Sequence, residues 1–224
     1  MSKRQEIREK RRRQQVRQRI LTIGLVAVAA VILVVVMIVS GLNAKSSGTS
    51  AHPMAKDNSM GNPDALVKVE EFSDFSCSHC RDFSLQQEPG LVKKYIATGK
   101  VYFTFYTFSF LRPQSLDAAE AVYCAMDQGK FWEYKDALFA STVNPLNEPF
   151  TKVNFISYAQ KLGMDTTAFG SCLDTGKYKQ RVQDDLALGK SKGVEGTPTF
   201  FVNGQMVYAG ELETTIENSL KTAQ

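Results

Sequence analysis

The pattern of apolar and polar positions divides the chain into two parts. Residues 20–42 contain no charged side chain, and residues 20–39 are almost entirely Leu, Ile, Val and Ala. At 1.5 Å per residue this twenty-residue run spans about 30 Å, the thickness of a bilayer hydrocarbon core. From residue 63 to residue 224 the apolar positions recur with the periods of strands and amphipathic helices. We therefore predict one transmembrane helix at 20–42 and a globular domain at 63–224.

The globular part begins with the order strand, helix, strand. Residues 66–72 alternate as in a strand, and the alternation places Glu71 on the same face as two valines. A helix is predicted from Cys77, and Pro89-Gly90 is expected to kink or break it. Residues 101–108 form an aromatic and β-branched run, which is typical of a strand covered on both faces. Together these segments predict a βαβ unit.

From about residue 113 to residue 192 the pattern becomes helical. Apolar spacing and end signals predict helices at 115–127, 131–140, 151–162, 166–173 and 178–191. The chain then returns to two short strands joined by Asn203-Gly204, the strongest short hairpin signal, and ends in a helix at 212–223.

The charge is distributed unevenly between the two parts. The net charge is +4, but residues 1–19 hold nine Lys and Arg against two Glu, a balance of +7. The rest of the chain therefore carries 18 basic and 21 acidic residues, or −3. A mildly acidic domain gives no electrostatic basis for binding nucleic acid. The basic tail at 1–19 instead predicts a cytoplasmic N-terminus in contact with the lipid bilayer, with the domain on the other side of the plasma membrane.

A cleaved signal peptide is the alternative explanation of the N-terminus. Its apolar region is usually about 7–15 residues long, and no convincing cleavage site precedes Lys45. We therefore favour an uncleaved, single-pass signal anchor. Residues 43–62 are rich in small and polar residues without apolar periodicity, and we expect a flexible linker with a solvated His52. The chain has no N-x-Ser/Thr glycosylation site, which is compatible with a bacterial source.

The segment Cys77-Ser78-His79-Cys80 places two cysteines at the start of the first predicted helix. Unpaired backbone N–H groups and the helix dipole favour an anion there, so Cys77 should be the thiolate nucleophile. Cys80 lies one turn later and is placed to attack a mixed disulfide at Cys77, and His79 adds a titratable group. A structural disulfide and half of a zinc site are the alternatives. Zinc needs about four ligands, and His52 is the only other histidine, so we expect no metal.

Two separated motifs resemble those of the DsbA-like thiol-disulfide oxidoreductases of the thioredoxin superfamily. The motifs are Phe72–Cys80 and Gly193–Phe201, and the likeness extends from about Gly61 to the C-terminus. The resemblance implies an α/β thioredoxin-like fold with an inserted α-helical subdomain at about 113–192. It also implies that Thr197-Pro198 is a cis-proline loop that binds extended substrate. Ser78 stands where the best-known DsbA proteins have proline, and this departure bears on the redox potential.

The resemblance also bears on Glu71, six residues before Cys77. The family has a buried acid at this place that is thought to help proton transfer at the second cysteine, and burial would raise its pKa. The alternative is a glutamate at the rim of the sheet that pairs with a lysine. Together with Ser78 and His79, Glu71 is a candidate for tuning the active site.

Cys124 and Cys172 both lie in the predicted helical insertion. Four cysteines allow three pairings, and only Cys77–Cys80 with Cys124–Cys172 leaves the motif free to cycle. Such a second pair should be oxidised outside the cytoplasm and act as a structural disulfide. The alternative is two unpaired buried thiols.

The resulting hypothesis is a membrane-anchored protein disulfide oxidase acting on exported or unfolded protein thiols. Its redox-active group would be the Cys77–Cys80 disulfide, without a metal or organic cofactor. By resemblance, a quinone-linked membrane oxidase, DsbB-like or vitamin-K-epoxide-reductase-like (VKOR-like), would reoxidise it. A disulfide reductase or isomerase using the same motif is one alternative. A non-enzymatic surface binding module with two structural disulfides is the other.

Overall fold

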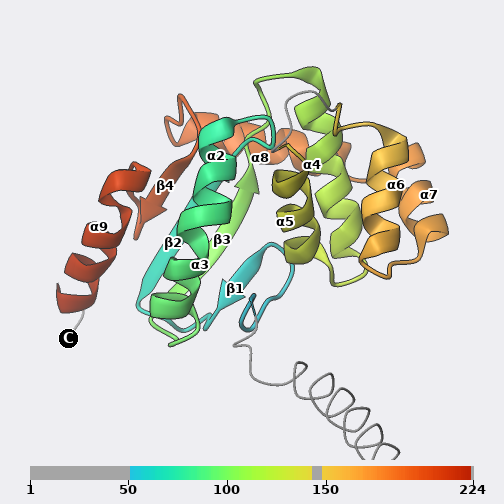
Figure 1. Ribbon diagram of the computed structural model, residues 1–224. Helices are drawn as coiled ribbons and strands as arrows, with labels where there is room; N and C mark the ends of the chain where they lie inside the picture. Colours follow the sequence, from blue (N-terminus) through green and yellow to red (C-terminus); the bar gives the residue numbers. More distant parts are fainter. Residues whose placement is uncertain (1–50, 143–147, 223–224) are drawn as a thin grey trace, which may run out of the picture. The chain divides into compact units, whose positions relative to one another are not determined.

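A five-stranded mixed sheet forms the centre of the domain (Figure 1). The computed structural model describes residues 51–142 and 148–222. The strands are β1 (Ser59–Gly61), β2 (Val67–Ser73), β3 (Val101–Thr107), β4 (Thr199–Val202) and β5 (Gln205–Val207), in the order β1-β3-β2-β4-β5. Only β2 and β3 are parallel; the other neighbours are antiparallel. The predicted βαβ unit therefore supplies the two central strands.

Helices cover both faces of this sheet (Figure 1). On one face, Val67 and Val69 of β2 share a buried cluster with residues of the helix that follows β2 and of α9 (Ala209–Thr222). On the other face, Phe72 of β2 belongs to a separate cluster packed against α8 (Lys179–Ser191). The alternation of β2 thus separates two cores, as the period of a strand requires.

Four helices form the helical subdomain beside the sheet (Figure 1). They are α4 (Pro113–Met126), α5 (Phe131–Ser141), α6 (Lys152–Lys161) and α7 (Thr166–Thr175), and they pack on one another. Side-chain oxygens of Thr151 and Asp165 cap α6 and α7 by accepting backbone N–H bonds. The thioredoxin-like fold with an inserted helical subdomain is therefore confirmed. The inserted segment consists of these four helices and α8, which packs against the sheet.

The sequence predicts a kink or break at Pro89-Gly90, but the chain does not break there, because it stays helical from Ser78 to Ile96. This stretch consists of α2 (Ser78–Asp82), a π-helical segment at Phe83–Gln87, α3 (Glu88–Leu91) and a second π-helical segment at Val92–Ile96. Pro89, in the first turn of α3, follows directly on the π-helical segment Phe83–Gln87. Proline has no N–H to donate, and its ring clashes with the carbonyl four residues earlier in a regular α-helix. The π-helical segments on either side of α3 change the hydrogen-bond spacing, which lets the helix continue past the proline.

The predicted linker at 43–62 is also wrong for its described part. Residues 59–61 form β1, paired with β3, and Met60 is fully buried. His52 is not solvated: its ring stacks on Trp132 at 5.8 Å, and its Nε2 lies 3.0 Å from Asp136 Oδ2. These partners lie far away in the sequence, so the local composition of the segment does not reveal them.

The predicted tail at 1–19 and anchor at 20–42 lie outside the described residues. Within 51–142 and 148–222, no helix is both long and apolar enough to cross a membrane.

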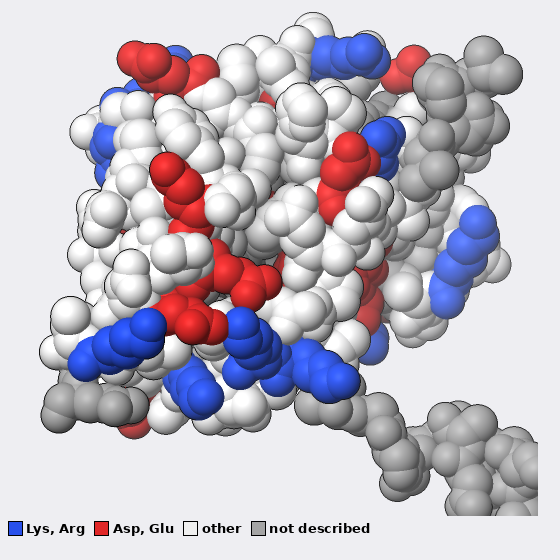
Figure 2. All heavy atoms as spheres, turned by 60° about the vertical axis from the view of Figure 1, so that its left-hand side comes forward, with Lys and Arg blue, Asp and Glu red and all other residues white. Residues whose placement is uncertain are grey.

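Acidic and basic side chains lie beside one another on the face that Figure 2 shows, which brings the α9 side forward. Ion pairs join α9 to the helix after β2, with Lys94 Nζ 3.1 Å from Glu213 and 2.8 Å from Glu217. On this face the basic side chains along the lower edge adjoin a central group of acidic side chains, so both signs of charge share the surface.

Candidate active site

Asp74 shapes the turn that presents the cysteine motif. Its Oδ1 accepts a hydrogen bond from the Ser76 N–H at 2.7 Å, and its Oδ2 accepts from the N–H groups of Phe110 and Leu111, both at 2.9 Å. The backbone carbonyl of Asp74 accepts from the Cys77 N–H at 3.0 Å. This buried carboxylate therefore ties the end of β2 to the loop after β3 and fixes where the helix begins.

Cys77 is the N-cap residue of α2, in an extended conformation with φ −82° and ψ 122°. Cys80 lies one turn later. Both are free thiols; Cys80 is fully buried, whereas 8% of Cys77 is exposed. A substrate sulfur can therefore reach Cys77 but not Cys80.

The loop at Thr197, which lies 120 residues after Cys77 in the sequence, forms the opposite wall of the site. The Thr197-Pro198 peptide bond is cis. Cys77 Sγ lies 3.2 Å from the Thr197 carbonyl oxygen, to which the thiol donates a hydrogen bond when it is protonated. The loop that precedes β4 thus lies directly against the cysteine motif, where an extended substrate segment can pair with its backbone.

The two thiols are electrostatically unequal. The pKa of Cys77 is lowered from 9.0 to about 5. The largest cause is a hydrogen bond from the Cys80 thiol; it acts against burial and is supported by the backbone N–H groups of Cys80 and His79. Burial raises the pKa of Cys80, and the adjoining Cys77 raises it further. Near neutral pH the pair therefore consists of a Cys77 thiolate and a Cys80 thiol.

Glu71 of β2 is fully buried, which excludes the alternative of a glutamate at the rim of the sheet. The Ser73 hydroxyl donates to its Oε1, whereas its Oε2 has no hydrogen-bond partner among the described residues. Its pKa is raised to about 8, first by burial and then by repulsion from Glu88. Glu71 is therefore an internal acid that can exchange a proton near neutral pH.

Ser78 and His79 are exposed and lie between the two cysteines. The contribution of residue 79 to the lowered pKa of Cys77 comes through its backbone N–H. Tuning by the two side chains remains a prediction.

The cysteines of the helical subdomain form a disulfide. Cys124 of α4 and Cys172 of α7 are bonded, with Cα atoms 5.8 Å apart. Because this bond occupies both thiols, only Cys77 and Cys80 are free for exchange. Among the described residues, no group of three or more His, Cys, Asp or Glu side chains is arranged to hold a metal ion.

A pocket of about 160 Å³ opens beside Cys77. Arg81, Arg112 and Glu148 line this pocket together with Cys77, so charged groups of both signs border it. Sequence analysis missed both arginines and also Asp74. An aspartate two residues before a serine, just ahead of a helix, is a recognisable turn signal and could have identified Asp74.

Comparison with known proteins agrees with this geometry. The family model described as Thioredoxin matches residues 54–221. The probable disulfide bond formation protein D of Bacillus anthracis is 30% identical over 212 residues, covering 91% of this chain and 97% of that protein. Disulfide bond formation protein D of Bacillus subtilis is 29% identical over 172 residues, covering 72% and 76%. The oxidised crystal structure of BdbD from Bacillus subtilis superposes with a TM-score of 0.69 at 26% identity, covering 76% of this chain and 96% of that one.

The family match spans most of the domain, and the relatives align over most of their own length. The BdbD structure shares the fold with the helical insertion. In this chain, the free cysteine pair lies against the Thr197-Pro198 cis-proline loop. The chain therefore belongs to the thioredoxin family and is a DsbA-like thiol-disulfide oxidoreductase.

Proposed function

We propose that this oxidoreductase is a dithiol oxidase that introduces disulfides into exported proteins. A substrate thiolate attacks Cys77 Sγ, forming a mixed disulfide as the Cys77–Cys80 bond breaks. The electron pair of that bond leaves on Cys80 Sγ, which takes up a proton. A second substrate thiolate then attacks the substrate sulfur of the mixed disulfide, and Cys77 leaves as a thiolate. Two electrons thus pass from the substrate dithiol to the enzyme.

The stabilised Cys77 thiolate is the observation that carries this direction. Its pKa of about 5 means that the reduced enzyme holds a low-energy anion at neutral pH. Stabilising the reduced form makes the disulfide easier to reduce and therefore a stronger oxidant. Cys77 is also the better leaving group of the two sulfurs, which favours release of oxidised substrate.

Glu71 fits the proton transfer that this mechanism needs at Cys80. Cys80 is fully buried and must gain a proton as its sulfur leaves, because burial disfavours the anion. A buried carboxyl group with a pKa of about 8 and one oxygen without a hydrogen-bond partner among the described residues supports Glu71 as the source of that proton. The same carboxyl group would accept the proton when Cys80 attacks during reoxidation.

The cellular setting belongs to the same proposal. The charge-free run at 20–42 after a basic tail supports a single-pass anchor with a cytoplasmic N-terminus and a catalytic domain outside the cytoplasm. A reoxidising partner in the same membrane, DsbB-like or VKOR-like and linked to quinones, would remove the two electrons after each turnover.

Equilibration of the full-length protein with glutathione redox buffers, in detergent micelles, tests the direction of the reaction. We expect a reduction potential near the −120 mV of strongly oxidising DsbA proteins, and at least above about −180 mV. The oxidised enzyme should also restore disulfides to a reduced secreted protein. A potential near about −270 mV, the value for thioredoxin, would replace the oxidase with a reductant. A pair that does not exchange with glutathione at all would favour the non-enzymatic binding module.

A further inference from the structure

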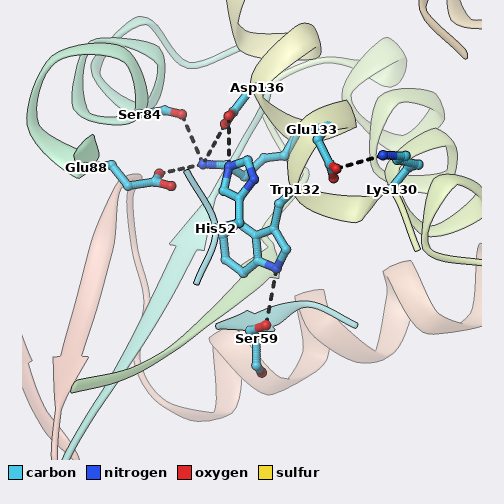
Figure 3. Close-up of polar contacts among 9 residues, drawn as sticks. His52, Ser59, Ser84, Glu88, Lys130, Trp132, Glu133 and Asp136 are labelled. Atoms are coloured by element: carbon cyan, nitrogen blue, oxygen red, sulfur yellow. Dashed lines mark hydrogen bonds and ion pairs between the residues drawn. The ribbon is translucent and has the colours of Figure 1, made fainter. Parts of the chain in front are cut away.

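A lysine of the helical subdomain is completely buried next to the active-site helix. Ser84, Glu88 and Asp136 point toward a common centre in Figure 3. The Nζ of Lys135, from α5, lies there: it contacts Glu88 Oε2, is 3.1 Å from Ser84 Oγ and is 3.4 Å from Asp136 Oδ1. The Lys135 side chain has no exposed surface, and that of Glu88 is only 5% exposed. The subdomain thus inserts one positive charge beside the helix that carries both redox cysteines.

The surroundings of this ammonium group are aromatic. Its Nζ lies 5.4 to 5.8 Å from the ring centroids of Phe105, Trp132 and Phe139. Burial alone would lower the pKa of Lys135, but Glu88, Asp136 and Glu71 raise it above its ordinary value. The group therefore stays charged. Burying a cation is unfavourable unless partners compensate, and the thiol exchange described so far does not use this cation.

The Lys135 charge also acts on Glu71. Phe105, one of the rings next to Lys135, pairs with Glu71 across β2 and β3. The side chains of Lys135 and Glu71 are both fully buried, so solvent hardly screens the interaction between their charges. The two members of the ion pair act on Glu71 with opposite sign: Glu88 raises the pKa of Glu71, and Lys135 lowers it.

We propose that Lys135 and Glu88 are positioning residues of the thiol exchange, whose ion pair sets whether Glu71 holds a proton when Cys80 must gain or lose one. This inference rests on the proposed role of Glu71. When the Cys77–Cys80 bond breaks, the electron pair leaves on Cys80 and the proton moves from Glu71 to that sulfur. During reoxidation the proton returns to Glu71 as Cys80 attacks. Lys135 and Glu88 neither donate nor accept this proton; they act only through their charges.

Besides Glu71, the titratable groups Asp136 and His52 also act on the Lys135–Glu88 ion pair. Asp136, next to Lys135 on α5, also binds His52 Nε2 at 3.0 Å, and the His52 ring stacks on Trp132. On the active-site side, Cys77 acts on Glu71 through its charge, and the Ser73 hydroxyl donates to Glu71 Oε1 and also hydrogen-bonds Cys80. Glu71 therefore experiences the ion pair from one direction and the reacting sulfurs from the other.

The opposite signs give a test that a purely structural ion pair does not pass. In Lys135→Met the methionine keeps most of the buried volume, but Glu71 loses the attraction of the Lys135 charge and should bind its proton more tightly. In Glu88→Gln the shape is retained, the repelling anion is lost and the Lys135 charge remains, so Glu71 should release its proton more easily. A structural pair predicts only lower stability in both variants, with no shift in the titration of Glu71.

The measurement is the titration of the Glu71 carboxyl carbon by NMR, on reduced full-length protein labelled at its glutamate side chains, in detergent micelles. Glu71→Gln assigns the signal. We expect its midpoint to rise in Lys135→Met and to fall in Glu88→Gln, each by about one pH unit or more. The double variant Lys135→Met, Glu88→Gln should lie between the two. The pH profile for attack by Cys80 on a mixed disulfide at Cys77 should move in the same directions, and in a Glu71→Gln background it should not move.

An unchanged Glu71 midpoint in both variants, or a shift of the same sign in both, would overturn the inference. Glu88→Gln is decisive by itself if Lys135→Met does not fold, because only an electrostatic role predicts a downward shift. The titration does not depend on redox activity. A parent protein without thiol exchange would overturn the proposed function, whereas an active parent with unshifted variants would overturn only the role of the ion pair.

Discussion

The hydrogen bond from Cys80 should be the main reason why Cys77 is a thiolate, and Cys80→Ala tests this directly. Among the causes of the lowered Cys77 pKa, this bond ranks first. A hydrogen bond to a charged group is worth about 1.5–3 kcal/mol, and one pKa unit corresponds to about 1.36 kcal/mol. Removing the donor should therefore raise the pKa of Cys77 from about 5 to about 6–7.

The effect is largest when it is measured near the parent pKa. At pH 5 about half of the parent Cys77 is thiolate, whereas a pKa of about 6–7 leaves roughly 9% to 1%. Alkylation by iodoacetamide, which needs the thiolate, should therefore slow about five- to fifty-fold at pH 5. The variant gives a clean signal, because Cys124 and Cys172 are bonded to each other and Cys77 is the only other cysteine of the sequence.

Cys80→Ser is the matched control, because its hydroxyl keeps a donor at the same place. Its Cys77 should titrate closer to the parent than that of Cys80→Ala, as followed by thiolate absorbance and by the alkylation rate. If Cys80→Ala keeps the parent pKa, the thiolate is stabilised by the helix N-terminus and Thr197 instead. If the alanine and serine variants titrate together, the proposed hydrogen bond is not the cause.

Three further predictions concern stability and topology. Replacing Cys124 and Cys172 with alanine opens a loop of 48 residues and should lower the free energy of unfolding by about 4 kcal/mol, measured by urea denaturation; thiol exchange at Cys77 should persist, and a folded but inactive variant would contradict a structural role. The raised pKa of Glu71 stabilises the fold fully below its ordinary value of 4.5, and this contribution is lost as pH rises through about 8. Glu71→Gln should therefore gain stability over the parent from pH 4.5 to 8 in parallel denaturation series, and a constant difference would refute the burial argument. Protease added to intact spheroplasts should digest the chain after Lys45 and spare an N-terminal tag, whereas release of the whole domain by signal peptidase would refute the anchor.

Local patterns determined the elements and the chemistry of this chain. Alternation placed Glu71 on the apolar face of its strand, and the spacing of Cys77 and Cys80 placed both sulfurs on the first turn of a helix. Capping residues and helical periodicity located the inserted helices to within a few residues. Such features depend on neighbours within about one turn or one strand, so the sequence by itself contains the information.

One local signal was present but not used. Lys135 follows Phe131 by four residues and precedes Phe139 by four, so it lies on the apolar stripe of its helix. A lysine at such a position indicates a buried charge, but only the fold identifies its partner. Glu88, 47 residues earlier, supplies that partner from the active-site helix.

Only the tertiary structure decided which distant groups meet at the site. Thr197 reaches Cys77 across 120 residues, and His52 reaches Asp136 across 84. A segment that composition marks as a linker became an edge strand because β3 offered it backbone hydrogen bonds. The physical reason is that periodicity specifies which face of an element is apolar but not which other face will cover it. The pKa values of Glu71 and Cys77 follow from those distant contacts and from burial, and therefore only the folded protein determines them.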